Sequence, residues 1–539
     1  MAATPSGAGV AGVAGLSGLL GRRWAPWACW GVVALVVLVL LDREGAPTTF
    51  FYDEWGFVQH RRGWSPNGFV QPHAGHLVAI PVLIYRVGFE LFGLTHYRPF
   101  RVMVLLSHLA VATAVFAYVK QRTHVLLAGC AGLAIAMLGS GWQNIYFPFS
   151  VSHTLPVALG IAAWMLLDRD TRRADHLAAG AHLVAVLSSG LGISMLIGSG
   201  VKLAVQREWG RAVRVLSPAA AAFVIWQLAY GKPAGTVDNL PRMPRYMVDM
   251  VAGGAGGLFA RDLLWGRLLL GVLVGLAAMR WRVLLPAAAP LGCLLGDVLL
   301  VAYNRAQFGD PTASRYAYEM AVLLLLVLAA ATAGRPLRRG ALPAGLVLCA
   351  LSIWGNWALL HRGALGLRID STISAHELRA VEWAAGVVAP EFEPDHQRMP
   401  FLYAGTYLAA VHELGSPATT DAAVLAAPEA TRQLVDQVSL GALGVFTEGF
   451  PTAVEPGDDC SAVDSGDEAV VQAGEVLWVR AGTAPVEVRA RRLADGYVAA
   501  PAHIVDAGAG FALSVPVDGA PTQTWSVQLT SAAAVLVCR

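Results

Sequence analysis

Long apolar runs alternate with short polar segments between about residue 24 and residue 360, and this pattern stops after that point. A membrane-spanning helix needs about 20 mostly apolar residues. The runs therefore predict an α-helical polytopic membrane protein of about eleven spans. They cover residues 26–41, 100–119, 125–141, 149–167, 177–189, 191–206, 212–230, 263–279, 283–302, 317–333 and 341–359.

Two apolar stretches depart from a simple span. The fifth and sixth runs are short and meet at residues 188–190, so they form either a tight helical hairpin or one broken helix, which a membrane tolerates only where protein or water covers the freed backbone. Residues 76–94 carry Pro81, Arg86 and Glu90. This second stretch predicts a helix lying at the outer interface rather than a twelfth span.

Beyond residue 360 the chain takes the composition of a soluble domain. Its first half mixes helical patterns, one of them at residues 375–388, with short apolar runs. Its second half has strand-like runs separated by Gly, Pro and Asp, as in a β-sandwich. There are six of these runs, at residues 470–471, 476–479, 486–489, 511–515, 525–529 and 534–537. Cys460 and Cys538 bracket that β-rich part, and outside the cytoplasm a disulfide between them is favoured over two free thiols.

The whole chain is expected to have three parts. They are a disordered cytoplasmic N-terminus (1–23), a membrane domain (24–360) with its first outer loop at 42–99, and an extracytoplasmic domain (361–539). The last is expected to be mixed α/β over 361–455 and β-rich over 456–539.

Composition and charge support this division and set the orientation. Hydrophobic residues make up 56% of the chain and charged residues only 14%, which excludes a soluble globule, a disordered chain and a nucleic-acid binder. The first 360 residues have 29 basic and 15 acidic side chains, a net +14, whereas the rest have 10 and 22, a net −12. Arginine-rich short loops stay in the cytoplasm. The pattern predicts a plasma-membrane protein with its N-terminus inside and its C-terminal domain outside.

The first outer loop holds the residues that suggest chemistry. Asp53 and Glu54 are adjacent carboxylates among aromatic residues just outside a span, and partial desolvation suits such a group for general-base work. Solvated acids in an aromatic belt are the equally weighted alternative. His73 and His76 follow, three residues apart, and they share a face if the helix starts there. We expect them to line a site, since two histidines without a further clear ligand are more often hydrogen-bonding residues than metal ligands.

A second set of candidates lies in the outer loop before a late span. Arg305, Arg315 and Tyr316 stand outside, against the trend of the other short-loop arginines. Exported arginines suit a bidentate grip on a phosphate or carboxylate, and binding of lipid headgroups is the competing interpretation. His108 and Asp297 lie within spans, where ionisable groups usually face the interior of the bundle and have a partner. For Asp297 the expected partner is Arg305 or Arg315.

Together these features resemble the GT-C class of integral-membrane glycosyltransferases, over residues 24 to about 360. The segment Trp142-Gln-Asn-Ile-Tyr146 is also similar to an outer loop of related bacterial membrane proteins. The resemblance implies a polyprenyl-phosphate sugar donor and an acidic catalytic residue at Asp53, with Glu54 beside it. It further implies that Ser314-Arg315-Tyr316 faces the donor phosphate with help from Arg305.

The expected partners are a lipid-linked sugar donor and a glycan, lipid or protein acceptor in the cell envelope, with no nucleic acid. No cofactor has a signature in the sequence, and a divalent cation at the acidic pair is left open. Two functions of other kinds remain as alternatives: a transporter or flippase of lipid-linked sugars, and a non-catalytic membrane scaffold with a sugar-binding outer domain. A transporter commonly has internal repeats, and none is visible between the two halves.

Overall fold

The computed structural model describes residues 23–539 except 232–234, 280, 337–339, 447–459 and 498–500. The predicted disordered N-terminus therefore lies almost wholly outside the described residues. The chain divides into two compact units. Unit 1 comprises Met1–Ala46, Ser65–Tyr85 and Arg98–Leu367, and unit 2 comprises Pro47–Trp64, Arg86–Tyr97 and Arg368–Arg539. Two segments of the first outer loop thus belong to the same compact unit as the C-terminal part of the chain.

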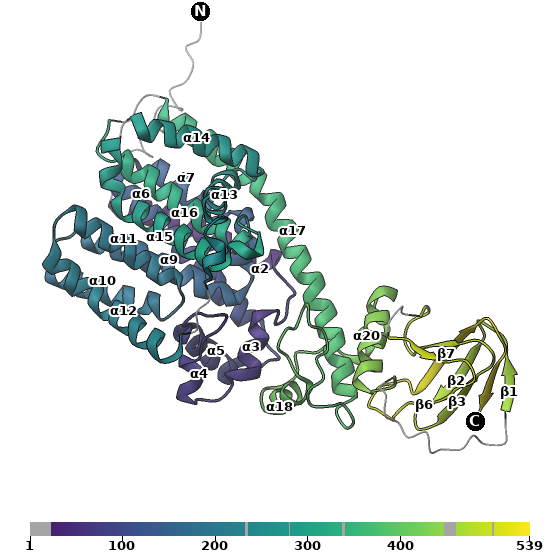
Figure 1. Cartoon of the computed structure of the whole chain (residues 1–539). Coiled ribbons are helices and arrows are strands. Elements are labelled where there is room, and N and C mark those ends of the chain that lie inside the picture. Colours follow the sequence, from purple (N-terminus) through teal and green to yellow (C-terminus); the bar gives the residue numbers. More distant parts are fainter. Residues whose placement is uncertain (1–22, 232–234, 280, 337–339, 447–459, 498–500) are drawn as a thin grey trace, which may run out of the picture. The chain divides into compact units, whose positions relative to one another are not determined.

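Unit 1 is built from helices (Figure 1). Its complete helices are α2 (Ala25–Glu44), α4 (Pro66–Val70), α6 (Arg98–Arg122), α7 (Val125–Ala136), α8 (Trp142–Tyr146), α9 (Val151–Leu167), α10 (Arg172–Val186), α11 (Leu191–Val205), α12 (Trp209–Tyr230), α13 (Met243–Gly257), α14 (Leu263–Met279), α15 (Ala288–Arg305) and α16 (Ser314–Ala331). The residues of α5 (Ala79–Phe92) and α17 (Ala341–Trp383) are divided between the two units.

The helices confirm a multi-pass membrane protein. In the described part of the chain, seven helical segments are long and apolar enough to cross a membrane, and a bent pair within residues 125–146 makes a possible eighth. These eight correspond to eight of the eleven predicted runs. Two other runs form the shorter apolar helices α11 and α14, and the run at 177–189 falls in α10. The predicted outer helix is α5, which has 14 residues and is not among the candidate spans.

The bent pair is a span interrupted by close helix packing. Helix α7 ends at Ala136, within the third apolar run, and the chain turns through Gly139 and Gly141 before α8. A Cβ atom on Gly139 would lie 1.9 Å from the carbonyl oxygen of Asn356, so only glycine fits there. The Asn356 side chain accepts a hydrogen bond from the backbone N–H of Ser140 at 2.8 Å. Close packing against Asn356 therefore accounts for the break in the helix. The same residue provides a hydrogen-bond partner for a backbone N–H group that the break leaves without one.

Helices α10 and α11 decide whether the fifth and sixth apolar runs form a helical hairpin or one broken helix. They are separate helices joined by the short turn between Val186 and Leu191, and Figure 1 shows them side by side. A Cβ atom on Gly192 would lie 2.3 Å from the backbone of Ala185, so glycine allows the two helices to approach closely at the turn. The pair is a helical hairpin rather than one broken span.

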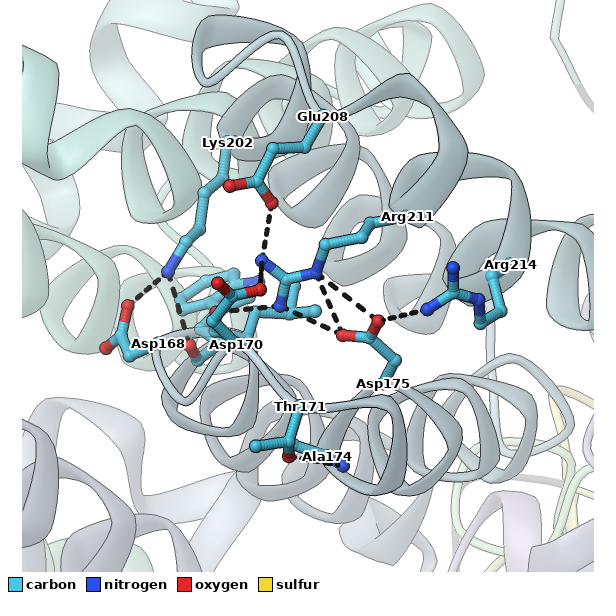
Figure 2. A network of polar contacts seen from close by, with 11 residues as sticks. Asp168, Asp170, Thr171, Ala174, Asp175, Lys202, Glu208, Arg211 and Arg214 are labelled. Carbon is cyan, nitrogen blue, oxygen red and sulfur yellow. Dashed lines mark hydrogen bonds and ion pairs between the residues drawn. The ribbon is translucent and has the colours of Figure 1, made fainter.

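An ionic network ties α9, α10, α11 and α12 together at one end (Figure 2). Arg211 of α12 donates to Asp175 of α10 at 2.9 Å, and Arg214 donates to the same carboxylate at 2.7 Å. Lys202 of α11 donates to Asp168, the residue that follows α9. All five residues lie in or beside loops whose arginines predict a cytoplasmic position, so the network marks the predicted cytoplasmic end of this group of helices.

Unit 2 joins short helices to a β-sandwich. Its complete helices are α3 (Asp53–His60), α18 (Ala404–Leu414), α19 (Asp421–Leu425) and α20 (Glu429–Ala442). Its strands are β1 (Cys460–Val463), β2 (Glu468–Gln472), β3 (Val476–Ala481), β4 (Val486–Arg491), β5 (His503–Val505), β6 (Gly510–Ser514), β7 (Thr524–Ser531) and β8 (Val535–Cys538). They form two antiparallel four-stranded sheets in the orders β1-β8-β3-β6 and β2-β7-β4-β5. Alternating residues such as Leu477, Val479, Trp525 and Val527 fill the space between the sheets.

The predicted disulfide is confirmed. Cys460 and Cys538 are directly paired across β1 and β8 and are bonded to each other. In the same unit, the Arg492 guanidinium forms a fully buried ion pair with Asp518 at 2.8 Å. It also contacts the rings of Trp383 and Trp525, at 5.4 and 4.6 Å from their centroids. Because Trp383 ends α17, this contact anchors the helix to the sandwich within unit 2.

Candidate functional site

His73 and His76 flank a tight turn in unit 1. Each backbone N–H donates to the carbonyl of the other residue, both at 2.9 Å. The two residues between them, Ala74 and Gly75, have positive φ angles of 47° and 84°. Positive φ at both central positions defines a type I′ turn, which is unfavourable for alanine. The surroundings must therefore hold this turn in place, and backbone strain of this kind clusters at functional sites.

Arg305 supplies one such restraint. It is the last residue of α15, and its Nη2 donates to the carbonyl of Ala74 at 3.3 Å. The structure thus brings Arg305 together with both predicted histidines, although 229 residues separate Arg305 from His76. A guanidinium has five N–H donors, so one hydrogen bond to a carbonyl leaves others available for an anionic ligand.

His76 is surrounded by protein and still accessible. A Cβ atom on Gly190, in the α10–α11 turn, would lie 2.9 Å from Nδ1 of His76, so glycine makes room for the ring. Desolvation by the surrounding protein lowers the pKa of His76 to about 4, and the positive charges of Arg305, His153 and His73 contribute to this. The side chain nevertheless keeps an exposed surface. At neutral pH it is therefore an uncharged imidazole that a solute can reach.

A pair of ionisable residues from two membrane helices lies next to this turn. Nδ1 of His153 on α9 is 2.7 Å from Oε1 of Glu319 on α16, and the Glu319 side chain is only 3% exposed. A buried charge needs a partner of this kind. The charge of His153 is felt at His76, so the pair belongs to the surroundings of the turn.

The expected ion pair between Asp297 and Arg305 or Arg315 is not formed. Oδ1 of Asp297 instead accepts a hydrogen bond from Ser194 at 2.9 Å, and its charge interacts with that of Glu319. Asp297 and Arg305 lie on the same helix, eight residues apart. At 1.5 Å per residue this separation is about 12 Å along the helix axis, which is too far for an ion pair.

Arg315 and Tyr316 lie in the first turn of α16, and Glu319 lies in the next turn. The guanidinium of Arg315 lies 4.9 Å from the ring centroid of Tyr316, and its charge interacts with Glu319. Tyr316 is buried. Ser314, which precedes them, accepts a hydrogen bond from the backbone N–H of Gln143 in α8 at 3.2 Å. The broken span therefore packs against the start of α16, which carries the predicted phosphate-binding arginine.

We call these residues of unit 1 the polar cluster: His73, His76, His153, Arg305, Arg315 and Glu319. Sequence reasoning singled out four of them and missed His153 and Glu319. Both lie inside predicted spans, where an ionisable side chain is itself a functional signal. In the part of the chain that the structure describes, no group of three or more His, Cys, Asp or Glu side chains is placed to hold a metal ion.

The predicted acidic pair lies in unit 2. Asp53 is the first residue of α3 and is half-buried, and Tyr52 before it has a φ of 51°, a conformation that non-glycine residues rarely adopt. Glu54 is fully buried, and its Oε2 accepts hydrogen bonds from the Tyr97 hydroxyl at 2.8 Å and the Phe51 N–H at 3.1 Å. Glu54 therefore anchors α3, whereas Asp53 is the more accessible carboxylate. That Asp53 acts together with the residues of the polar cluster stays a prediction.

Comparisons with known proteins were made at the level of sequence and of structure. No family model and no curated protein matches the chain. The chain is similar to two crystal structures of ArnT from Cupriavidus metallidurans, one bound to undecaprenyl phosphate and one in the apo state, each with 15% sequence identity and a TM-score of 0.44. The match to the first structure covers 71% of this chain and 85% of that structure's chain. The match to the second covers 74% of this chain and 90% of that structure's chain. Similarity at this level assigns neither a family nor an activity.

Proposed function

We propose that this protein is a membrane glycosyltransferase that moves a sugar from a polyprenyl-phosphate donor to an acceptor at the extracytoplasmic face. The polar cluster is the observation that supports this proposal most. Two arginines and an accessible neutral histidine gather at the ends of membrane helices, beside a strained turn. A lipid phosphate needs cations at such a place, and a sugar needs neutral hydrogen-bonding groups.

The cluster divides into groups with different roles. Arg305 and Arg315 bind the donor phosphate and stabilise the negative charge that develops on it as the bond to the sugar breaks. His76, being uncharged, hydrogen-bonds a sugar or acceptor hydroxyl. His153 and Glu319 support the turn and the start of α16 from inside the helix bundle.

Asp53 is the proposed general base. It accepts the proton of the acceptor hydroxyl while the hydroxyl oxygen forms a bond to the anomeric carbon of the sugar. The bond between that carbon and the phosphate oxygen breaks, and the lipid phosphate leaves with the bonding electrons. Glu54 fixes α3 through Tyr97 and so holds the position of Asp53.

The test compares Asp53→Asn with wild type in transfer of radiolabelled sugar from polyprenyl phosphate to cell-envelope acceptors. We expect transfer to fall by about 10²-fold or more, as for removal of a general base. Asp238→Asn is the matched control, because Asp238 is an exposed acid in the segment between α12 and α13. Unchanged transfer by Asp53→Asn would contradict the assignment. Movement of the intact lipid-linked sugar across vesicles, without any transfer product, would favour the transporter instead.

A further inference from the structure

An apolar recess of about 370 Å³ lies among α13, α14 and α17 of unit 1. Its walls include Phe259, Arg261, Trp265, Leu351 and Trp354. None of its lining residues belongs to the polar cluster. The recess is therefore a second feature of the membrane domain, to which the proposed transfer reaction assigns no role.

The walls of the recess are fixed by specific contacts. A Cβ atom on Gly355 would lie 2.9 Å from the carbonyl oxygen of Phe259, so glycine lets α17 approach the end of α13. The Asn356 side chain donates to the carbonyls of Gly257 and Leu258, both at 3.1 Å. These bonds hold the two helices together on either side of the hollow, so the recess exists before any ligand enters.

The recess is polar at one end and apolar at the other. Arg261 lies two residues before α14, whereas Leu269 lies two turns inside that helix, about 12 Å further along its axis. Along α17, Trp354 and Leu348 lie about 9 Å apart. Trp265 and Trp354, 60% and 74% exposed, lie toward the polar end. Tryptophan is favoured at the level of lipid headgroups.

Arg261 is available for a ligand. Among the residues that the structure describes, no carboxylate forms an ion pair with it. The neighbouring Asp262 is engaged elsewhere, because its Oδ1 accepts hydrogen bonds from the N–H groups of Leu264 and Trp265 at 3.1 and 3.2 Å. An exposed guanidinium above an apolar recess matches a phosphate group that is joined to a hydrocarbon chain.

We propose that this recess binds a phospholipid with an anionic headgroup. Its phosphate contacts Arg261, its glycerol region lies between Trp265 and Trp354, and an acyl chain follows Leu269 and Leu351. The bound lipid covers apolar surface between α14 and α17 and stabilises their arrangement.

Native mass spectrometry of the purified protein tests this, with dioleoylphosphatidylglycerol and dioleoylphosphatidylcholine as probes. We expect one phosphatidylglycerol to bind with about fivefold preference, the effect of one arginine near an anionic headgroup. Arg261→Gln should abolish the preference, and Arg242→Gln, which changes an exposed arginine just before α13, should keep it. Equal binding of both lipids to wild type, or an unchanged preference in Arg261→Gln, would overturn the proposal.

A second variant tests the apolar end. Leu351→Trp fills the recess and should reduce binding of both phospholipids, whereas Leu346→Trp, at an exposed position of α17 outside the recess, should not. Unchanged binding in Leu351→Trp would place the lipid elsewhere. Undecaprenyl phosphate could instead displace phosphatidylglycerol from the wild-type protein but not from Arg261→Gln. That result would identify the recess as a site for a polyprenyl lipid and would also overturn the proposal.

Discussion

Nδ1 of His153 lies 2.7 Å from Oε1 of Glu319, although 166 residues separate them in the chain. The contact joins α9 to α16 inside the helix bundle. It also connects two other members of the polar cluster, since the charge of Glu319 interacts with Arg315 and that of His153 interacts with His76. The pair therefore holds the two halves of the polar cluster in one arrangement.

Glu319→Gln should lower kcat/KM for transfer by about tenfold, because a hydrogen bond contributes roughly 0.5–1.5 kcal/mol and this change alters the bond to His153. The amide keeps the size of the side chain but replaces the carboxyl group. Glu44→Gln is the matched control, since Glu44 forms a similar pair with His361 at 2.6 Å in the same unit. Equal losses in the two variants would indicate a general structural effect.

Arg305→Ala should weaken use of the lipid-phosphate donor by about tenfold or more, since it removes a charged donor and the bond to Ala74. Arg305→Lys should recover only part of this, because an ammonium group lacks the planar fork of a guanidinium. The measurement is the donor KM. A donor KM unchanged in both variants would exclude a phosphate-binding role for Arg305.

The stability of the protein should depend on pH through His76. Its pKa is about 4 in the folded protein against an ordinary 6.5, so between these values the unfolded chain binds more protons. Stability is therefore complete above pH 6.5 and falls as the pH drops toward 4. His76→Asn should flatten this part of the profile, measured as melting temperature against pH. A parallel profile in the variant would show that other groups cause the slope.

Arg492→Ala should destabilise unit 2 by about 3–5 kcal/mol, because it leaves the Asp518 carboxylate buried without its partner. Unfolding in urea, followed by tryptophan fluorescence, measures the loss. Arg489→Ala is the control, since Arg489 pairs with Glu487 at a half-exposed position of the same region, where about 1 kcal/mol or less is expected. Similar losses in the two variants would argue against the importance of the buried pair.

Apolar patterns predicted most of the fold. The runs at 100–119 and 317–333 became α6 and α16, and the alternation in the C-terminal part predicted six of the eight strands, because burial imposes a period that is visible locally. The pattern did not predict that the last span and the helix expected at residues 375–388 form one helix, α17. At 43 residues and about 65 Å, it is twice as long as a bilayer is thick.

The site was less predictable because it depends on contacts between distant segments. His108, expected to have a partner in the bundle, is fully buried with Nδ1 2.9 Å from the Tyr318 hydroxyl. The sequence offered no way to find that partner, nor to pair His153 with Glu319. Side-chain type and position in a span suggest that a residue has a function, but only helix packing decides which residues meet.

The ionic network of Figure 2 bears on how this bundle moves. Asp168 and His153 belong to opposite ends of α9, about 22 Å apart along the helix axis. To open at the Asp168 end, the bundle must separate Arg211 and Arg214 from Asp175, and Lys202 from Asp168. Alternating access requires a bundle to part at each end in turn. This group of helices is clamped at one end, which favours entry and exit of substrates from a single side.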